Sequence, residues 1–184
     1  MPAKGLQSWP RLQIFSMIHA QNGFTMHDMQ IDTVDARILA ALQRNGRLGN
    51  AELSEAVGLS ASQCSRRRTA LEEAGIIARY AALLSPNAIG LDLTAFVEVT
   101  LHAHSEERAR RFAQLIDRLD EVQEAHSLTG DTDYLLKLRV SDLSALSHIL
   151  NHVLLAHESV ARIRSSIVLD RLKETPELPL GHLG

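Results

Sequence analysis

Three short helical patterns follow one another within residues 30–80, and each opens on a residue type that caps helices. Asp32 precedes the first pattern and Asn50 the second. Ser60 precedes the third, and Gln63 three positions later completes a capping box, in which each side chain bonds the other residue's backbone N–H. Short helices with such brief connections are stable only when their apolar faces pack together. The spacing therefore predicts a small three-helix domain.

Apolar residues at helical spacing supply a core for this domain. They are Ile38, Leu39, Leu42, Leu53, Ala56, Val57, Cys64 and Leu71. Gly58 permits the sharp turn between the second and third helices, and Gly75 ends the third. The next segment, IIARYAALLS, is typical of extended structure. It predicts a wing or connecting strand, with a linker strand over residues 81–93.

The third helix presents a polar face that includes part of a run of three arginines. At about 100° per residue, Ser62 and Arg66 point outward, while Gln63 and Ser65 lie on the flanks. Arginine pairs with guanine and glutamine with adenine in the major groove. An arginine run by itself is usually a solvated face, but in the last of three capped helices it is typical of a helix-turn-helix reader of double-stranded DNA. The candidate DNA-binding residues are Asn50, Ser60, Ser62, Gln63, Ser65, Arg66 and Arg67, the last as a phosphate contact.

Two other residues of this helix have simpler interpretations. Arg68 lies only about 40° from the inward stripe. Either its stem packs while the guanidinium reaches solvent, or it pairs with a carboxylate. Cys64, the single cysteine, is most simply a small buried thiol rather than a redox switch. One cysteine also excludes an intramolecular disulfide and a cysteine-based zinc cluster.

The net charge of −3 is unevenly distributed along the chain. Residues 30–85 contain seven Lys/Arg against six Asp/Glu, whereas residues 86–184 contain ten against fifteen. A near-neutral head beside an acidic domain is compatible with DNA binding, because phosphates are attracted by local basic patches. It argues against a protein that coats nucleic acid by charge alone. No apolar run approaches the ~20 residues that span a bilayer, so we expect no membrane partner. The single cysteine fits a reducing cytoplasm best.

The second half of the chain alternates strand-like and helix-like segments in the order βαββαβ. The strand-like segments are residues 94–101, 121–128, 134–140 and 160–169, and the helical ones are residues 106–119 and 142–155, the latter burying Leu143 and Leu146. This order predicts an α+β ferredoxin-like domain over residues 94–172, with helices on one face of a four-stranded sheet. On the first and last strands both faces carry apolar groups, because Phe96 opposes Val97 and Val99, and Val168 opposes Ile167 and Leu169. An uncovered apolar sheet face predicts a homodimer.

The two ends of the chain lie outside these domains. Residues 1–29 show weak periodicity, and we expect them to be disordered or to precede the true translation start at Met26 or Met29. Residues 173–184 form a C-terminal tail.

The sequence carries no signature of catalysis or of a cofactor. His148 and His152 are four apart on a helix, but no Cys, Asp or Glu within that helix completes a zinc set. No Ser-His-Asp arrangement, phosphate loop or carboxylate pair is present. We therefore expect no metal, no cofactor and no enzymatic activity.

The ordered motifs ID..D..IL..LQ.NGR, AELSEAVGLS, S.S.C..R...LE..GII, Tyr80 and TGDTDYLL resemble the leucine-responsive and asparagine-regulator (Lrp/AsnC) family of transcription regulators. The resemblance covers about residues 31–180. It implies a winged helix-turn-helix followed by a ferredoxin-like ligand-sensing domain. It also implies dimers joined through their sheets and assembled into octamers or similar rings. Arg68, where the family usually has an apolar residue, and the N-terminal extension depart from the family pattern.

The resemblance further implies a small-molecule effector, most often an amino acid, near a Gly-Asp-x-Asp turn. The residues carried over are Thr129, Gly130, Asp131, Asp133 and Tyr134. Backbone N–H groups of a glycine turn can bind a carboxylate, and aspartates can accept from an ammonium. From the residues alone, a tight hairpin without a ligand explains the same motif equally well.

Two rival functions remain open. Sirohaem-pathway decarboxylases look similar in their two-domain organisation, and His126 would be a candidate to act on a tetrapyrrole. An architectural protein that compacts DNA would instead bind with little sequence preference. The outward Ser62 and Arg66 favour DNA reading over the enzymatic alternative, whereas competition binding against random duplex would separate the architectural role from specific regulation.

Overall fold

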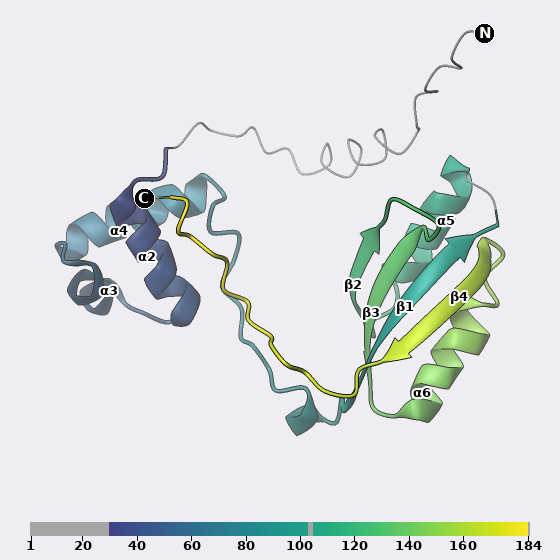
Figure 1. The fold of residues 1–184 in the computed structure, drawn as a ribbon. Coiled ribbons are helices and arrows are strands. Elements are labelled where there is room, and N and C mark those ends of the chain that lie inside the picture. Colours follow the sequence, from purple (N-terminus) through teal and green to yellow (C-terminus); the bar gives the residue numbers. More distant parts are fainter. Residues whose placement is uncertain (1–29, 103–104, 184) are drawn as a thin grey trace, which may run out of the picture. The chain divides into compact units, whose positions relative to one another are not determined.

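The computed structural model describes residues 30–102 and 105–183, which form two compact units (Figure 1). The first unit, here called the head, ends at Ala82 and also takes in the residues from Thr175 onward. The second unit, here called the sheet domain, spans Leu83–Glu174. The predictions for the N-terminal extension, including an internal translation start, fall outside the described residues.

Among the described residues, three helices form the head, as predicted. They are α2 (Thr33–Arg44), α3 (Asn50–Val57) and α4 (Ala61–Glu73). Their buried residues form one core, made of Ile38, Leu39, Leu42, Leu53, Val57, Cys64 and Leu71. Ala56 was predicted to face this core but is exposed. The short α3 reaches the core only through Leu53 and Val57, which lie one turn apart on the same side.

Two of the three predicted helix caps are formed. Asp32 caps α2 and Ser60 caps α4, each in a capping box with the residue three positions later. The prediction that Asn50 caps α3 was wrong, because Asn50 is already the first helical residue. The cap is Gly49, whose backbone N–H donates to Glu52 Oε2 at 2.7 Å. The acidic residue at the third helical position was the overlooked signal.

The linker between the units contains no strand. Residues 74–92 follow turns and irregular backbone, with one short 3-10 turn at Asn87–Ile89. The linker strand predicted over residues 81–93 is therefore not formed before Leu93, where β1 (Leu93–Leu101) begins. An extended segment becomes a strand only when a neighbouring strand takes up its hydrogen bonds, and no described strand pairs with this segment.

The sheet domain has the predicted βαββαβ order. Its elements are β1 (Leu93–Leu101), α5 (Glu106–Ile116), β2 (Val122–Ser127), β3 (Tyr134–Val140), α6 (Leu143–His148), the π-helical turn η2 (Ile149–Leu154) and β4 (Val160–Ile167). The strands lie in the order β2-β3-β1-β4, and every neighbouring pair is antiparallel. This is the ferredoxin-like arrangement.

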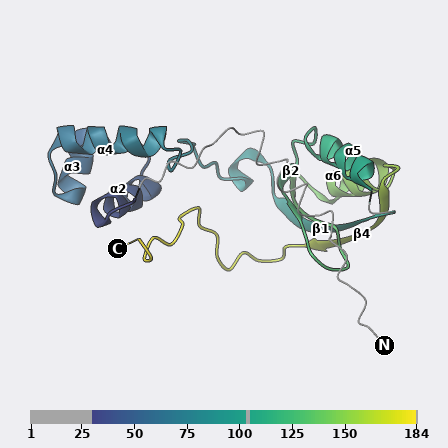
Figure 2. The ribbon, with the colours of Figure 1, turned by 90° about the horizontal axis from the view of Figure 1, so that it is seen from above.

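Both α5 and α6 cover the same face of the sheet (Figures 1 and 2). Alternate residues of β1 and β3 point towards these helices and form the core with them. The core includes Ala95, Val97, Val99, Phe112, Leu136, Leu138, Leu146 and Leu154. Leu143 was predicted to be buried but is 62% exposed. It is the first residue of α6, immediately after the cap Asp142. The side of the helix that packs on the sheet begins only after this position.

The other face of the sheet, here called the open face, is largely charged. Arg164 lies 3.6 Å from Glu98 across β4 and β1, and Lys137 lies 2.7 Å from Glu124 across β3 and β2. Phe96 is 38% exposed on this face. The prediction of an apolar uncovered face was therefore wrong. It rested on single strands, whereas the antiparallel register brings charged residues of neighbouring strands together around Phe96.

The C-terminal tail lies against the head. Gln43 of α2 donates to the backbone carbonyl of Leu178 at 3.2 Å and accepts from its backbone N–H at 2.7 Å. Leu180 packs against the head core. The tail therefore belongs structurally to the head, although it follows the sheet domain in sequence.

We expect Leu180→Ala to lower the free energy of unfolding of the head by about 1–2 kcal/mol, because a partly buried leucine loses less than a fully buried one. Leu169→Ala is the matched control, since Leu169 is 98% exposed. It should change stability by less than about 0.5 kcal/mol. Hydrogen exchange in peptides from α2 measures both variants. Equal exchange rates in the two would mean that the tail does not stabilise the head.

Candidate nucleic-acid interface and effector turn

Most candidate DNA-binding residues gather at the N-terminal end of α4. The exposed ones are Asn50, Ser60, Ser62, Gln63 and Arg66, and the half-buried ones are Ser65 and Arg67. Ser60 Oγ lies 3.1 Å from Ser62 Oγ and 2.9 Å from Gln63 Oε1. The helix cap therefore also fixes a cluster of hydrogen-bonding groups at the end of a helix where recognition helices carry their base contacts.

Arg66 follows this cluster and is the arginine that remains available. Its side chain is exposed and makes no hydrogen bond or ion pair with any residue in the described part of the chain. A guanidinium has five N–H donors in a planar fork, which match the two acceptors of guanine or of a phosphate. None of these five donors has a partner in residues 30–102 or 105–183, so that part of the chain leaves all of them for an external acceptor.

Arg67 forms two ion pairs with carboxylates of the head. Its Nη1 lies 2.9 Å from Asp32 Oδ2 and 2.8 Å from Asp35 Oδ1. Only 3% of the Asp35 side chain is exposed, so the guanidinium compensates a carboxylate that water does not reach. Hydrogen bonds to Asp35 and Asp32 raise the pKa of the Arg67 guanidinium. The hydrogen bond from the Asp35 backbone N–H is the largest cause that lowers the pKa of Asp32.

These ion pairs join the N-terminus of α2 to the middle of α4. They give Arg67 a structural role that the sequence interpretation did not include. The phosphate contact suggested for Arg67 stays a prediction, and it would have to share a guanidinium that two carboxylates already hold.

Arg68 pairs with a carboxylate, which decides between its two alternatives. Its Nε lies 3.0 Å from Glu72 Oε1, and its Nη1 donates to the Leu48 carbonyl at 3.1 Å. The guanidinium carbon lies 4.7 Å from the centre of the Tyr80 ring. The Tyr80 hydroxyl donates to Glu72 at 2.8 Å. This hydrogen bond, followed by that from Arg68, lowers the pKa of Glu72.

The TGDTD turn joins β2 to β3, and its residues divide into two groups. Thr129, Gly130 and Asp131 are exposed. Gly130 has φ +123°, a backbone conformation that favours glycine. Tyr134 is half-buried, and its ring centre lies 4.9 Å from that of Phe112 in the core. The exposed tip of the turn is therefore the part that an external ligand can reach directly.

Asp133 belongs to the buried part of the turn, with 6% exposure. Its Oδ2 accepts from the backbone N–H of Leu101 at 2.9 Å, and its own N–H donates to the Val99 carbonyl at 3.0 Å. Both partners lie at the end of β1. Asp133 therefore ties the turn to the centre of the sheet, a contact that the motif alone did not reveal.

The remaining histidine hypotheses find little support in the described residues. The rings of His148 and His152 lie 5.3 Å apart, but the described part of the chain holds no group of three or more potential metal ligands. His126 lies on β2 and is 3.3 Å from Glu124. Within the same residues no helix is long and apolar enough to cross a bilayer.

A three-helix head with a capped polar helix, joined to a ferredoxin-like domain, has the organisation of a two-domain DNA-binding regulator of transcription. Comparison with known families agrees. Residues 31–78 match a winged helix-turn-helix DNA-binding model, and residues 94–178 match the Lrp/AsnC ligand-binding domain. The leucine-responsive regulatory protein of Escherichia coli is 40% identical over 148 residues, which are 80% of this chain and 90% of that protein. The chain belongs to the Lrp/AsnC family.

Solved structures support the same assignment. A transcriptional regulator from Neisseria meningitidis, in complex with L-methionine, has a TM-score of 0.80 and 46% identity. The match covers 83% of this chain and 98% of that one. AsnC of E. coli has a TM-score of 0.75 and 29% identity, covering 82% of this chain and all of the other. The relatives are named as transcription regulators rather than enzymes.

Proposed function

We propose that the protein regulates transcription by inserting α4 into the major groove of its operator DNA. The observation that carries the proposal is the contrast among the three arginines. Arg67 and Arg68 are engaged in the head, whereas Arg66 is exposed beside the Ser60–Gln63 cluster. In this proposal Arg66 reads a base edge, and Ser62, Ser65 and Asn50 contribute neighbouring polar contacts. A regulator must reach the chromosome, so the proposal places it in the cytoplasm.

The proposed effector is an amino acid bound at the TGDTD turn. Thr129, Gly130 and Asp131 supply exposed backbone and carboxylate groups, the two kinds of group that bind the carboxylate and the ammonium of an amino acid. The L-methionine complex of the Neisseria relative supports this class of ligand. In this proposal, Asp133 and Tyr134, the more buried residues of the motif, hold the turn in position.

The proposal also includes a homodimer, with further assembly into an octamer or a similar ring. A dimer lets two copies of α4 contact half-sites one or two helical turns apart. Because the open face of the sheet is charged, a dimer formed through it would depend on ion pairs between copies as well as on Phe96. Its association should then weaken as salt rises.

We expect Arg66→Ala to weaken binding to the specific operator by about 1–3 kcal/mol and to relax the preference at one base position. Both effects are measured from the binding affinity for a DNA fragment that lies upstream of the protein's own gene. The affinity for a random duplex at the same fixed salt concentration provides the comparison. Arg37→Ala is the matched control, because Arg37 is also exposed on the head but lies on α2.

The outcome distinguishes three cases. A selective loss on the operator supports base reading by Arg66. Equal losses on operator and random duplex would make Arg66 a phosphate contact. If the unmodified protein binds both duplexes equally, the architectural role replaces specific regulation.

A further inference from the structure

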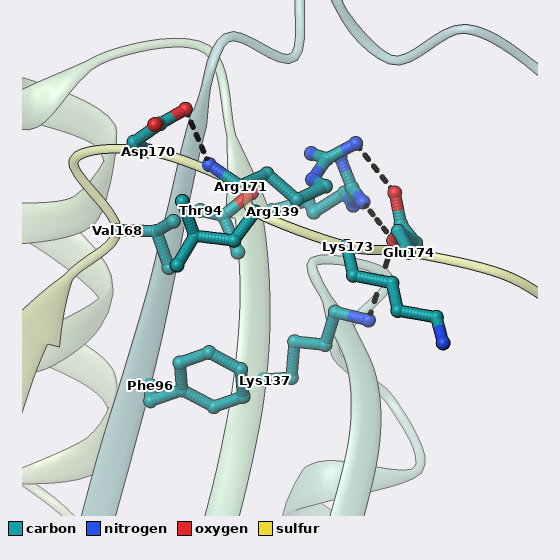
Figure 3. Close-up of a pocket in the computed structure, with 10 residues that line it drawn as sticks. Thr94, Phe96, Lys137, Arg139, Val168, Asp170, Arg171, Lys173 and Glu174 are labelled. Carbon is teal, nitrogen blue, oxygen red and sulfur yellow. Dashed lines mark hydrogen bonds and ion pairs between the residues drawn. The ribbon is translucent and has the colours of Figure 1, made fainter.

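The two sides of the sheet domain offer different groups to solvent. The open face holds a pocket in which charged groups pair with one another (Figure 3). Glu174 binds Arg139 at 2.9 Å and lies 3.8 Å from Lys137, which also pairs with Glu124. The proposed dimer would cover this face. The opposite side is the layer formed by α5 and α6 (Figure 2), and it carries two exposed histidines that the proposed function does not use.

These histidines are neighbours on the helix. His148 is the last residue of α6, and His152 lies in the π-helical turn η2 that continues it. Both side chains are exposed, and their ring centres lie 5.3 Å apart with an angle of 38° between the ring planes. Side chains four residues apart lie on the same side of a helix. The two imidazoles are therefore presented to solvent as a pair.

The separation of the rings fits one shared metal ion. A zinc–nitrogen bond of ~2.0–2.1 Å puts the ion about 3.2 Å from the centre of each imidazole, and two ring centres at a tetrahedral angle are then about 5.2 Å apart. The observed separation of 5.3 Å agrees with this value. The torsion that turns an imidazole on its Cβ is broad, so each ring can direct a nitrogen to the ion at little cost.

Two further features of this segment fit a cation site. The helix widens into a π turn here, with the Leu155 N–H donating to the Leu150 carbonyl at 3.0 Å. Such turns are rare in proteins and are frequent at functional sites. Residues 141–161 also contain no Lys or Arg. No fixed positive charge on this segment therefore opposes the approach of a dication.

We propose that His148 and His152 together bind one divalent transition-metal ion of the kind that imidazole prefers, such as Zn²⁺. The chain supplies these two ligands and water the others, since the described residues hold no group of three or more potential ligands. Such a site keeps open positions and is weaker than a closed structural zinc site. The expectation of no metal rested on the lack of a third ligand in this helix, and a two-ligand site does not need one. Binding of the ion requires neither DNA nor the amino-acid effector.

Isothermal titration of the full chain with zinc chloride, on protein without a histidine tag, tests the proposal. We expect one ion per chain. His148→Ala and His152→Ala should each weaken binding about tenfold or more, because either change leaves a single imidazole. The double variant should lie within about threefold of either single variant, since the chelate is already lost. His182→Ala, the matched control, removes another exposed histidine and should leave the affinity within about twofold.

Because both histidines are exposed, the alanine variants should unfold at the same temperature as the unmodified chain when no metal is present. Zinc should slow hydrogen exchange in peptides that cover residues 143–155, and this protection should be absent from the double variant. Magnesium chloride at the same concentrations should not bind, because Mg²⁺ prefers oxygen ligands.

Three results would overturn the proposal. Equal zinc affinity in the unmodified chain and in the double variant would assign the metal to other residues. Magnesium binding as tight as zinc binding would make the interaction one of charge rather than of imidazole. One ion per two chains, with zinc-dependent association in sedimentation, would replace the site within one chain by an ion that bridges two copies.

Discussion

Replacing Arg67 with alanine is expected to lower the free energy of unfolding of the head by about 3–4 kcal/mol, whereas replacing the adjacent Arg66 changes it by less than about 0.5 kcal/mol. Arg67 neutralises Asp35, whose side chain is 3% exposed, and links it to Asp32. Removing the guanidinium would leave a buried carboxylate without its cation. Because the Arg67 side chain is itself 30% exposed, the expected loss lies towards the lower end for buried ion pairs.

Hydrogen exchange in peptides from α2 and α4 reports this loss directly, since the ion pair joins those two helices. The double variant Asp35→Asn with Arg67→Met provides a further test, because it removes both charges together. It should recover part of the stability lost in Arg67→Ala. If Arg66→Ala and Arg67→Ala destabilise the head equally, the distinction between the two arginines is wrong. If Arg67→Ala loses only DNA affinity, the phosphate contact is its main role.

The local signals in the sequence predicted the fold well. The caps at Asp32 and Ser60 and the helical spacing of Leu39, Leu42 and Leu71 located the head, because these features depend on neighbours a few residues away. The alternation in β1 located the sheet core for the same reason. Residues of this kind report their surroundings through local periodicity.

The errors at Asn50 and Leu143 were local, whereas what was missed at Arg67, on the open face and in the C-terminal tail has a different cause, which is contact over long sequence separation. The partner of Arg67 lies 32 residues earlier, and the register across three strands determines the charge of the open face. The tail reaches Gln43 from 135 residues away. Side-chain type gives no indication of such pairings. The sequence therefore predicted which residues belong to the candidate site. It did not predict which of them are held in ion pairs within the head and which are exposed.

Asp133→Ala is expected to destabilise the sheet domain by about 2–3 kcal/mol, because it leaves the buried N–H of Leu101 without its charged acceptor. Asp131→Ala should be nearly neutral for stability, within about 0.5 kcal/mol, since Asp131 is exposed. Under the proposed function, Asp131→Ala should nevertheless reduce the response of DNA binding to an amino acid. Hydrogen exchange in β1 and β3 peptides, read beside DNA binding with and without L-methionine, measures both properties.

Asp133→Asn separates the two roles of Asp133, because an amide keeps an oxygen that can accept from Leu101 but carries no charge. If Asp133 only supports the turn, this variant should retain most of the stability and most of the amino-acid response. If it retains stability but loses the response, the Asp133 charge itself binds the effector ammonium, in spite of its burial. A full response in Asp131→Ala would remove Asp131 from the site. Full responses in all three variants would move the effector away from the TGDTD turn altogether.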